Sequence, residues 1–188
     1  MAPEFLVKII PITTESIFQL NLTESTLERM IIKYSEQIVF QPLQEIRHWF
    51  TYSSGAFLEP GYPPLYYSRD ASRMVSPNKS AVAAVGEGIA GFIAQRAYHC
   101  LKLARPNHDY PDIVMESNNI TYLVEAKATF SSQESTIESV IEAELPRFAG
   151  LIASAGELDL RPVRGLLIGT AVVSETDYRC YMIELELE

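Results

Sequence analysis

One stretch, PDIVMESNNITYLVEAKAT at residues 111–129, constrains the fold more than any other part of the chain. Two apolar runs flank a polar centre, which is the pattern of a β-hairpin. Asparagine tolerates the positive φ that a type I′ turn requires, so we expect Asn118 and Asn119 to form a two-residue turn. This turn pairs Ser117 with Ile120 and thereby fixes the register of the whole hairpin.

In that register Asp112 lies directly opposite Glu125, and Lys127 shares the face of Glu125. Opposed residues of an antiparallel pair have Cβ atoms about 4.5–5.5 Å apart, and residues two apart point the same way. Two opposed carboxylates repel, so a bound cation, the Lys127 ammonium or a raised carboxyl pKa must offset the repulsion. Mg²⁺ held by both carboxylates, with water and a substrate phosphate as further ligands, would do so. The alternative is a loop end at Asp112 beside a solvated strand edge.

The remaining pattern predicts an α/β fold with a mixed central sheet flanked by helices. Residues 5–12 and 16–23 read as strands and residues 24–37 as a helix, whereas residues 37–52 are ambiguous. Beyond a Gly-, Pro- and Ser-rich connector at residues 53–80, the expected order is helix, short strand, the two hairpin strands, helix and two strands. We expect residues 1–78 to form an N-terminal extension that packs on a core domain of residues 79–188.

Local signals predict where the helices begin and end. Thr23 is a candidate N-cap for the first helix, and Asn78 or Ser80 for the helix that follows the connector. A capping box formed by Ser131 and Glu134 is expected to open the helix after the hairpin. Within residues 131–156, Pro146 is expected to kink or split that helix, and Gly156 to end it.

Composition limits the class of protein. Apolar residues make up 47% and charged residues 21% of the 188 residues, which is enough to bury a core. Cys100 and Cys180 lack metal-type spacing, so we expect buried free thiols in a reducing cytoplasm. The N-terminal residues lack the pattern of a secretory signal, and no run approaches the ~18–20 apolar residues of a membrane span. We therefore expect a cytoplasmic protein with no membrane partner.

The negative charge is concentrated in the half that contains the hairpin. Residues 1–84 carry 7 basic and 8 acidic side chains, whereas residues 85–188 carry 8 basic and 16 acidic ones. Phosphate affinity comes chiefly from Lys and Arg, so this balance argues against a general nucleic-acid binder. It suits a divalent cation better than a bare phosphate.

The hairpin resembles the signature of the PD-(D/E)xK nuclease superfamily, which has the restriction-endonuclease-like fold. Pro111-Asp112 is similar to the first element of that signature, and Glu125-Ala126-Lys127 to the second. The resemblance covers about residues 80–173 and implies an αβββαβ core. It also implies that Asp112 and Glu125 ligate Mg²⁺, with Mn²⁺ as a possible substitute, that the Ala126 carbonyl is a further ligand, and that Lys127 is the catalytic lysine.

On the same resemblance, Glu87 occupies the position of an auxiliary metal ligand on the helix before the hairpin. An acid that stabilises the first turns of its own helix is the alternative. The implied function is a Mg²⁺-dependent endonuclease or phosphodiesterase that hydrolyses phosphodiester bonds, with DNA as the expected substrate and a possible homodimer. The alternatives are a catalytically inactive nuclease-like fold acting as a binding or assembly module, and an enzyme that uses the same carboxylates on a small molecule.

Three further features are candidates for a functional role. Gln133 could be a polar helper beside the lysine strand, although ordinary first-turn helix chemistry is the simpler reading. His99 and His108 could assist proton transfer, although a lone histidine is more often structural. Residues 61–80 interleave tyrosines with Arg69 and Arg73, which suits a nucleic-acid strand or a surface arm packed on the core.

Overall fold

The computed structural model describes residues 4–11, 18–36, 38–53, 58–59, 65–66, 77–106, 110–131, 134–159 and 161–186. The elements, in chain order, are β1 (Glu4–Pro11), β2 (Phe18–Thr23), α1 (Glu24–Tyr34), α2 (Pro42–Ser53), β3 (Leu58–Glu59), β4 (Leu65–Tyr66), α3 (Lys79–Ala97), β5 (Leu101–Ala104), β6 (Ile113–Ser117), β7 (Ile120–Thr129), α4 (Glu134–Leu158), β8 (Val163–Val172) and β9 (Asp177–Glu186). From α3 onward this is the predicted order of helices and strands.

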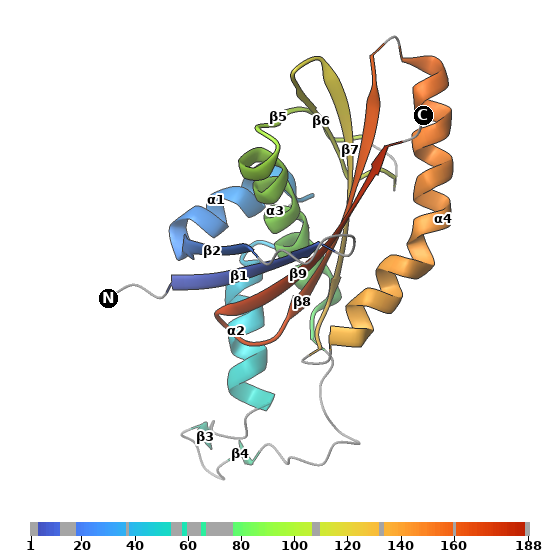
Figure 1. Cartoon of the computed structure of the whole chain (residues 1–188). Coiled ribbons are helices and arrows are strands. Elements are labelled where there is room, and N and C mark those ends of the chain that lie inside the picture. Colours follow the sequence, from blue (N-terminus) through green and yellow to red (C-terminus); the bar gives the residue numbers. More distant parts are fainter. Residues whose placement is uncertain are drawn as a thin grey trace.

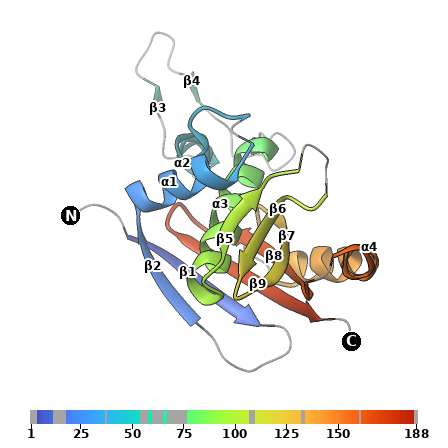
Figure 2. The ribbon, with the colours of Figure 1, turned by 90° about the horizontal axis from the view of Figure 1, so that it is seen from above.

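A mixed sheet lies between two helical layers, as predicted (Figure 1). Among the described strands its order is β2-β1-β9-β8-β7-β6-β5, and β3 and β4 pair separately. Strand β7 is parallel to β8 and antiparallel to β6, while β8 is antiparallel to β9. Figures 1 and 2 show α4 on one side of the sheet and α1, α2 and α3 on the other.

The β6–β7 hairpin has the predicted register. Ser117 pairs with Ile120, and the pairing continues to Ile113 opposite Val124. Asn118 and Asn119 have φ values of 49° and 64°, as a type I′ turn requires. The short turn sequence therefore determines which residues meet at the far end of the hairpin.

Residues on both sides of residue 78 build the same sheet. Strand β1 pairs antiparallel with β2 and parallel with β9, from Leu6 opposite Asp177 to Pro11 opposite Met182. Helix α1 packs on α3, where Gly91 lies so close to the Tyr34 ring that a Cβ atom would overlap it. The N-terminal segment thus supplies two strands to the sheet and a helix to one of its faces.

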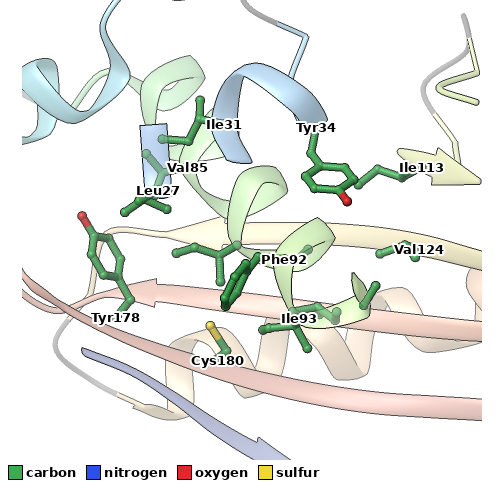
Figure 3. Close-up of a cluster of buried hydrophobic side chains, with 14 of the residues drawn as sticks. Leu27, Ile31, Tyr34, Val85, Phe92, Ile93, Ile113, Val124, Tyr178 and Cys180 are labelled. Carbon is green, nitrogen blue, oxygen red and sulfur yellow. The ribbon is translucent and has the colours of Figure 1, made fainter. Parts of the chain in front are cut away.

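The sheet buries side chains on both faces. Alternate residues of its central strands point to opposite faces, and they form two clusters of buried side chains. The cluster under α3 includes Val85, Phe92, Ile93, Val124, Tyr178 and Cys180, together with Leu27, Ile31 and Tyr34 of α1 (Figure 3). The cluster under α4 includes Leu123, Ile137, Ile141, Phe148, Ile152 and Leu167. Cys100 and Cys180 are buried free thiols, as expected.

Two of the predicted N-caps are confirmed. The Thr23 side chain accepts a hydrogen bond from the Thr26 amide, and the Asn78 side chain accepts from the amides of Ser80 and Ala81. The ambiguous segment at residues 37–52 contributes helix α2, which begins at Pro42. Proline suits this first helical position because its missing N–H would be unpaired there in any residue.

The predicted end of α4 is wrong. The helix runs from Glu134 through Pro146 to Leu158, so Pro146 does not split it and Gly156 lies inside it. Figure 1 shows the helix changing direction partway along its length, as a proline that removes one backbone hydrogen bond would cause. Buried contacts of Phe148 and Ile152 beyond Pro146 explain why the helix continues. The predicted capping box of Ser131 and Glu134 spans residues 132–133, which lie outside the described residues.

Candidate functional site

The site lies beside the first residue of β6, at the open end of the hairpin, where β7 continues beyond its pairing with β6. Strand β6 begins at Ile113, opposite Val124, while β7 runs on to Thr129. Asp112 fills the next position beside β7: its Oδ2 accepts a hydrogen bond from the Ala126 amide at 2.7 Å. The Asp112 amide in turn donates to Glu125 Oε2 at 3.3 Å. These reciprocal contacts hold the two acids together at the end of the hairpin.

Lys127 completes the predicted group of three charges. Its Nζ donates to Glu125 Oε1 at 2.6 Å, and it lies 3.6 Å from Oε2 of Glu144 on α4. The Glu125 side chain is 1% exposed, whereas that of Lys127 is 27% exposed. The ammonium therefore lies between a buried acid and solvent.

These side chains project toward α4. Along β7, Val124 packs in the cluster under α3, and Leu123 packs in the cluster under α4. Glu125 and Lys127 share the parity of Leu123, so they point to the α4 face. The contact between Lys127 and Glu144 agrees with that orientation.

Burial raises the pKa values of Glu125 and Asp112. Burial, reinforced by the negative charge of Asp112, raises the pKa of Glu125 to about 7, although Lys127 acts to lower it. Burial also raises the pKa of Asp112, against the effect of its hydrogen bond from Ala126. Burial would lower the pKa of Lys127, but its contacts with Glu125 and Glu144 outweigh this and raise it. Lys127 is therefore a cation at neutral pH that only partly compensates the two acids.

Glu87 lies on the opposite face of the sheet. Its neighbour Gly86 lies against Ala128 of β7, which has the opposite parity to Glu125. Glu87 Oε2 accepts from Arg105 Nη1 at 2.8 Å. The predicted auxiliary ligand therefore pairs with an arginine on the α3 side of the sheet.

Arg105, in the loop after β5, connects Glu87 to helix α1. Its Nη1 also donates to the Tyr34 carbonyl at the end of α1, and its Nη2 lies 3.1 Å from Glu36. Burial raises the pKa of Glu87, with a smaller contribution from Asp112, while Arg105 acts to lower it. With its side chain 18% exposed, Arg105 is a largely buried link between the N-terminal segment and the edge of the site.

A pocket of about 310 Å³ opens beside Glu87. Its other lining residues include Glu36, Lys79 and Ser80, and it does not include the hairpin acids. The pocket therefore borders Glu87 but not Asp112 or Glu125.

A cation–aromatic stack lies on the α4 side of the site. The Arg147 guanidinium carbon lies 4.1 Å from the centroid of the Tyr110 ring, and Lys127 Nζ lies 5.8 Å from the same centroid. Phe148 contacts that ring edge-on, with the centroids 6.0 Å apart. Arg147 also lies 3.5 Å from Glu144. Tyr110 thus joins the arginine of α4 to the lysine of β7.

Sequence reasoning missed Arg105, Glu36 and Glu144, and it treated Tyr110 as packing. Glu144 had a signal: it lies three residues after Ile141 and four before Phe148, both buried, so it is an acid on an apolar helical face. Arg105 had none, because its partners are distant in sequence.

Of the other candidate residues, His99 is the one that the structure describes. His99 is exposed with a φ of 54°. Gln133, His108, Arg69 and Arg73 lie outside the described residues.

Asp112 and Glu125 are the residues at the hairpin end that could hold a metal ion. No group of three or more His, Cys, Asp or Glu suited to a metal occurs among the residues that the structure describes. Mg²⁺ is commonly bound through one or two carboxylates, waters and substrate phosphates. Asp112 and Glu125 meet that requirement, with the Ala126 carbonyl adjacent.

The charged groups form two separate clusters. On the α4 side, contacts link three carboxylates, Asp112, Glu125 and Glu144, with the cations Lys127 and Arg147. On the α3 side, Glu36 and Glu87 pair with Arg105. Each cluster carries an excess of one negative charge when all of its members are ionised.

No protein-family model, curated protein or solved structure matches the chain. In the described part of the chain, none of the helices combines the length and apolar character needed to cross a membrane.

Proposed function

We propose that the protein is a Mg²⁺-dependent nuclease of the restriction-endonuclease-like type that hydrolyses phosphodiester bonds in DNA. The observation that carries this proposal is the meeting of Asp112, Glu125 and Lys127 at the end of the β6–β7 hairpin. The arrangement of α3, β5, β6, β7, α4 and β8 is also consistent with the αβββαβ core expected of that type.

The residues have distinct roles in the proposed reaction. Asp112 and Glu125 would hold the metal ion, with the Ala126 carbonyl as a third oxygen donor. Mg²⁺ bound there would supply charge stabilisation to the phosphate and to the leaving oxygen. Lys127, held by Glu125, orients a water for in-line attack and stabilises the charge that develops on the phosphate. Glu87 orders the edge of the site through Arg105. Action on both strands of a duplex requires two such sites, so a homodimer is part of the proposal.

A second candidate is a nuclease-like fold that serves as a binding or assembly module. Contacts within the site favour it: Lys127 is engaged by Glu125 and Glu144, and Glu87 by Arg105. The strongly acidic half of the chain also offers little attraction to a polyanion.

Cleavage assays on plasmid and single-stranded DNA with Mg²⁺ or Mn²⁺ separate the two candidates. We expect the wild type to cut, and Asp112→Asn and Lys127→Met to lose about a thousandfold or more in rate, because both act on the transition state. Glu186→Gln is the matched control: it removes a β9 carboxylate that is paired to Arg164 at 2.8 Å, near the opposite end of the sheet. Urea denaturation checks that each variant folds.

Absence of wild-type cleavage on any nucleic acid would favour the binding module. Mn²⁺ soaked into crystals gives an independent result, since anomalous density is expected between Asp112 and Glu125. Binding of Mn²⁺ there without cleavage would indicate an enzyme acting on a small molecule.

A further inference from the structure

Arg147 differs from the other arginines that the structure places in ion pairs near the sheet. Arg161 is paired with both Glu116 and Asp159, and Arg164 has an ion pair of 2.8 Å. Arg147 has one carboxylate contact, to Glu144 at 3.5 Å, and its side chain is 61% exposed. That distance is beyond the usual range of a charge-assisted hydrogen bond. Its donors are thus largely available to a ligand.

The Tyr110 ring holds this exposed arginine in place. A guanidinium carbon 4.1 Å from the ring centroid is within the range of a cation–π contact. The ring itself is fixed by Phe148 and by its position two residues before Asp112. Stacking orders the planar guanidinium but leaves its N–H groups free to bind a phosphate in a bidentate manner.

The arginine lies close to the proposed reaction centre. Glu144 is 3.5 Å from Arg147 and 3.6 Å from Lys127, and both cations lie over the Tyr110 ring. Arg147 is therefore about one side chain away from the group that would contact the scissile phosphate. An acidic protein that acts on a polyanion needs local positive charge at this place.

We infer that Arg147, stacked on Tyr110, binds a backbone phosphate of a nucleic-acid strand beside the Asp112–Glu125–Lys127 site and so positions the strand. This inference rests on the proposed function, and it specifies the substrate as a chain of phosphates. Glu144 attracts both Lys127 and Arg147, so it weakens the contact between Arg147 and the phosphate.

Binding of a fluorescein-labelled oligonucleotide, single-stranded or duplex, tests this inference by anisotropy. Ca²⁺ replaces Mg²⁺, and a gel checks that the DNA stays intact. We expect Arg147→Gln to weaken binding about tenfold, as expected for one charge-assisted hydrogen-bonded contact. The slope of log affinity against log salt should fall by about 0.7 for single strands and about 0.9 for duplex. Arg147→Lys should give an intermediate loss, because it keeps the charge and loses the planar fork.

Arg96→Gln is the matched control. Arg96 is also an exposed helical arginine over an aromatic ring, 5.5 Å from the centroid of Phe92. It lies in the last turn of α3, roughly 13 Å along the helix axis from Glu87 at 1.5 Å per residue. Its replacement should change affinity by less than about twofold, since it removes general positive charge but no contact at the site.

The outcomes separate this inference from the proposed function. Equal effects of Arg147→Gln and Arg96→Gln, or no DNA binding by the wild type, overturn the inference. If cleavage depends on Asp112 but is unchanged in Arg147→Gln, the proposed nuclease activity is supported and the role of Arg147 is refuted. Arg147-dependent binding without any cleavage supports the phosphate contact and refutes the nuclease.

Discussion

Two arginines flank the candidate site, and they are held in opposite ways. Arg105, on the α3 side, is 18% exposed and contacts Glu36, Glu87 and the Tyr34 carbonyl. Arg147, on the α4 side, is 61% exposed and has a single long contact with an acid. An arginine engaged by two carboxylates and a carbonyl joins structural elements, whereas an exposed one supported by a ring is suited to a ligand. The comparison assigns stability to the α3 side and recognition to the α4 side.

The largest expected effect is on stability and concerns Arg105. Arg105→Met leaves the half-buried Glu87 carboxylate and the Tyr34 carbonyl without their donor, so we expect a loss of about 3 kcal/mol in the free energy of unfolding. Arg147→Gln should change it by less than about 0.5 kcal/mol, because exposed ion pairs contribute little. Urea denaturation of both variants measures this difference. Equal losses would contradict the comparison.

Glu125 and Glu87 should differ in how strongly they make the free energy of unfolding depend on pH. Burial raises the pKa of Glu125 from 4.5 to about 7. Between these values the unfolded chain releases its proton first, so the metal-free native state loses up to about 3 kcal/mol as pH rises from 4.5 to 7. Glu125→Gln should abolish most of this slope. Glu87→Gln should change the dependence of stability on pH less than Glu125→Gln does, since Arg105 lies against the Glu87 carboxylate.

Denaturation in urea and EDTA at several pH values measures these slopes. A wild-type protein as stable at pH 7 as at pH 5 would show that Glu125 is already ionised at the lower value. Added Mg²⁺ should raise stability at pH 7 and above, because it binds only the native state.

Close packing between α1 and α3 should give a smaller loss. A Cβ atom at Gly91 would overlap the Tyr34 ring, so we expect Gly91→Ala to cost about 2 kcal/mol. Gly150→Ala is the control on α4, where a Cβ atom meets nothing within 4 Å, and alanine should stabilise that helix by up to about 1 kcal/mol. Thermal unfolding of both variants compares the two helical layers.

The smallest effect is expected at Glu144. Glu144→Gln removes the acid that attracts Lys127 and Arg147, so we expect oligonucleotide affinity to rise about threefold, the equivalent of one weak ion pair. The anisotropy assay described for Arg147 measures it. Unchanged or weaker binding would indicate that Glu144 positions the two cations instead of competing for them.

The parts of the site that depend on local rules could be predicted from sequence. The Asn118-Asn119 turn fixed the register, and the register determined that Asp112 meets Glu125. Glu87 shows where such reasoning ends. Its place on a helix could be read from apolar spacing, but the face of the sheet that the helix covers depends on the packing of the whole chain. The partners of Arg105 come from α1 and α3, and no local pattern encodes that meeting.

The pairing of β1 with β9 has a consequence for how the protein is made. A ribosome releases β1 early and β9 last of the described strands, so the first strand has no partner beyond β2 during most of synthesis. A two-stranded hairpin is marginally stable in water, and its open edge can pair with other nascent chains. The open edge of β1 is therefore covered only when β9, the last of the described strands, pairs with it.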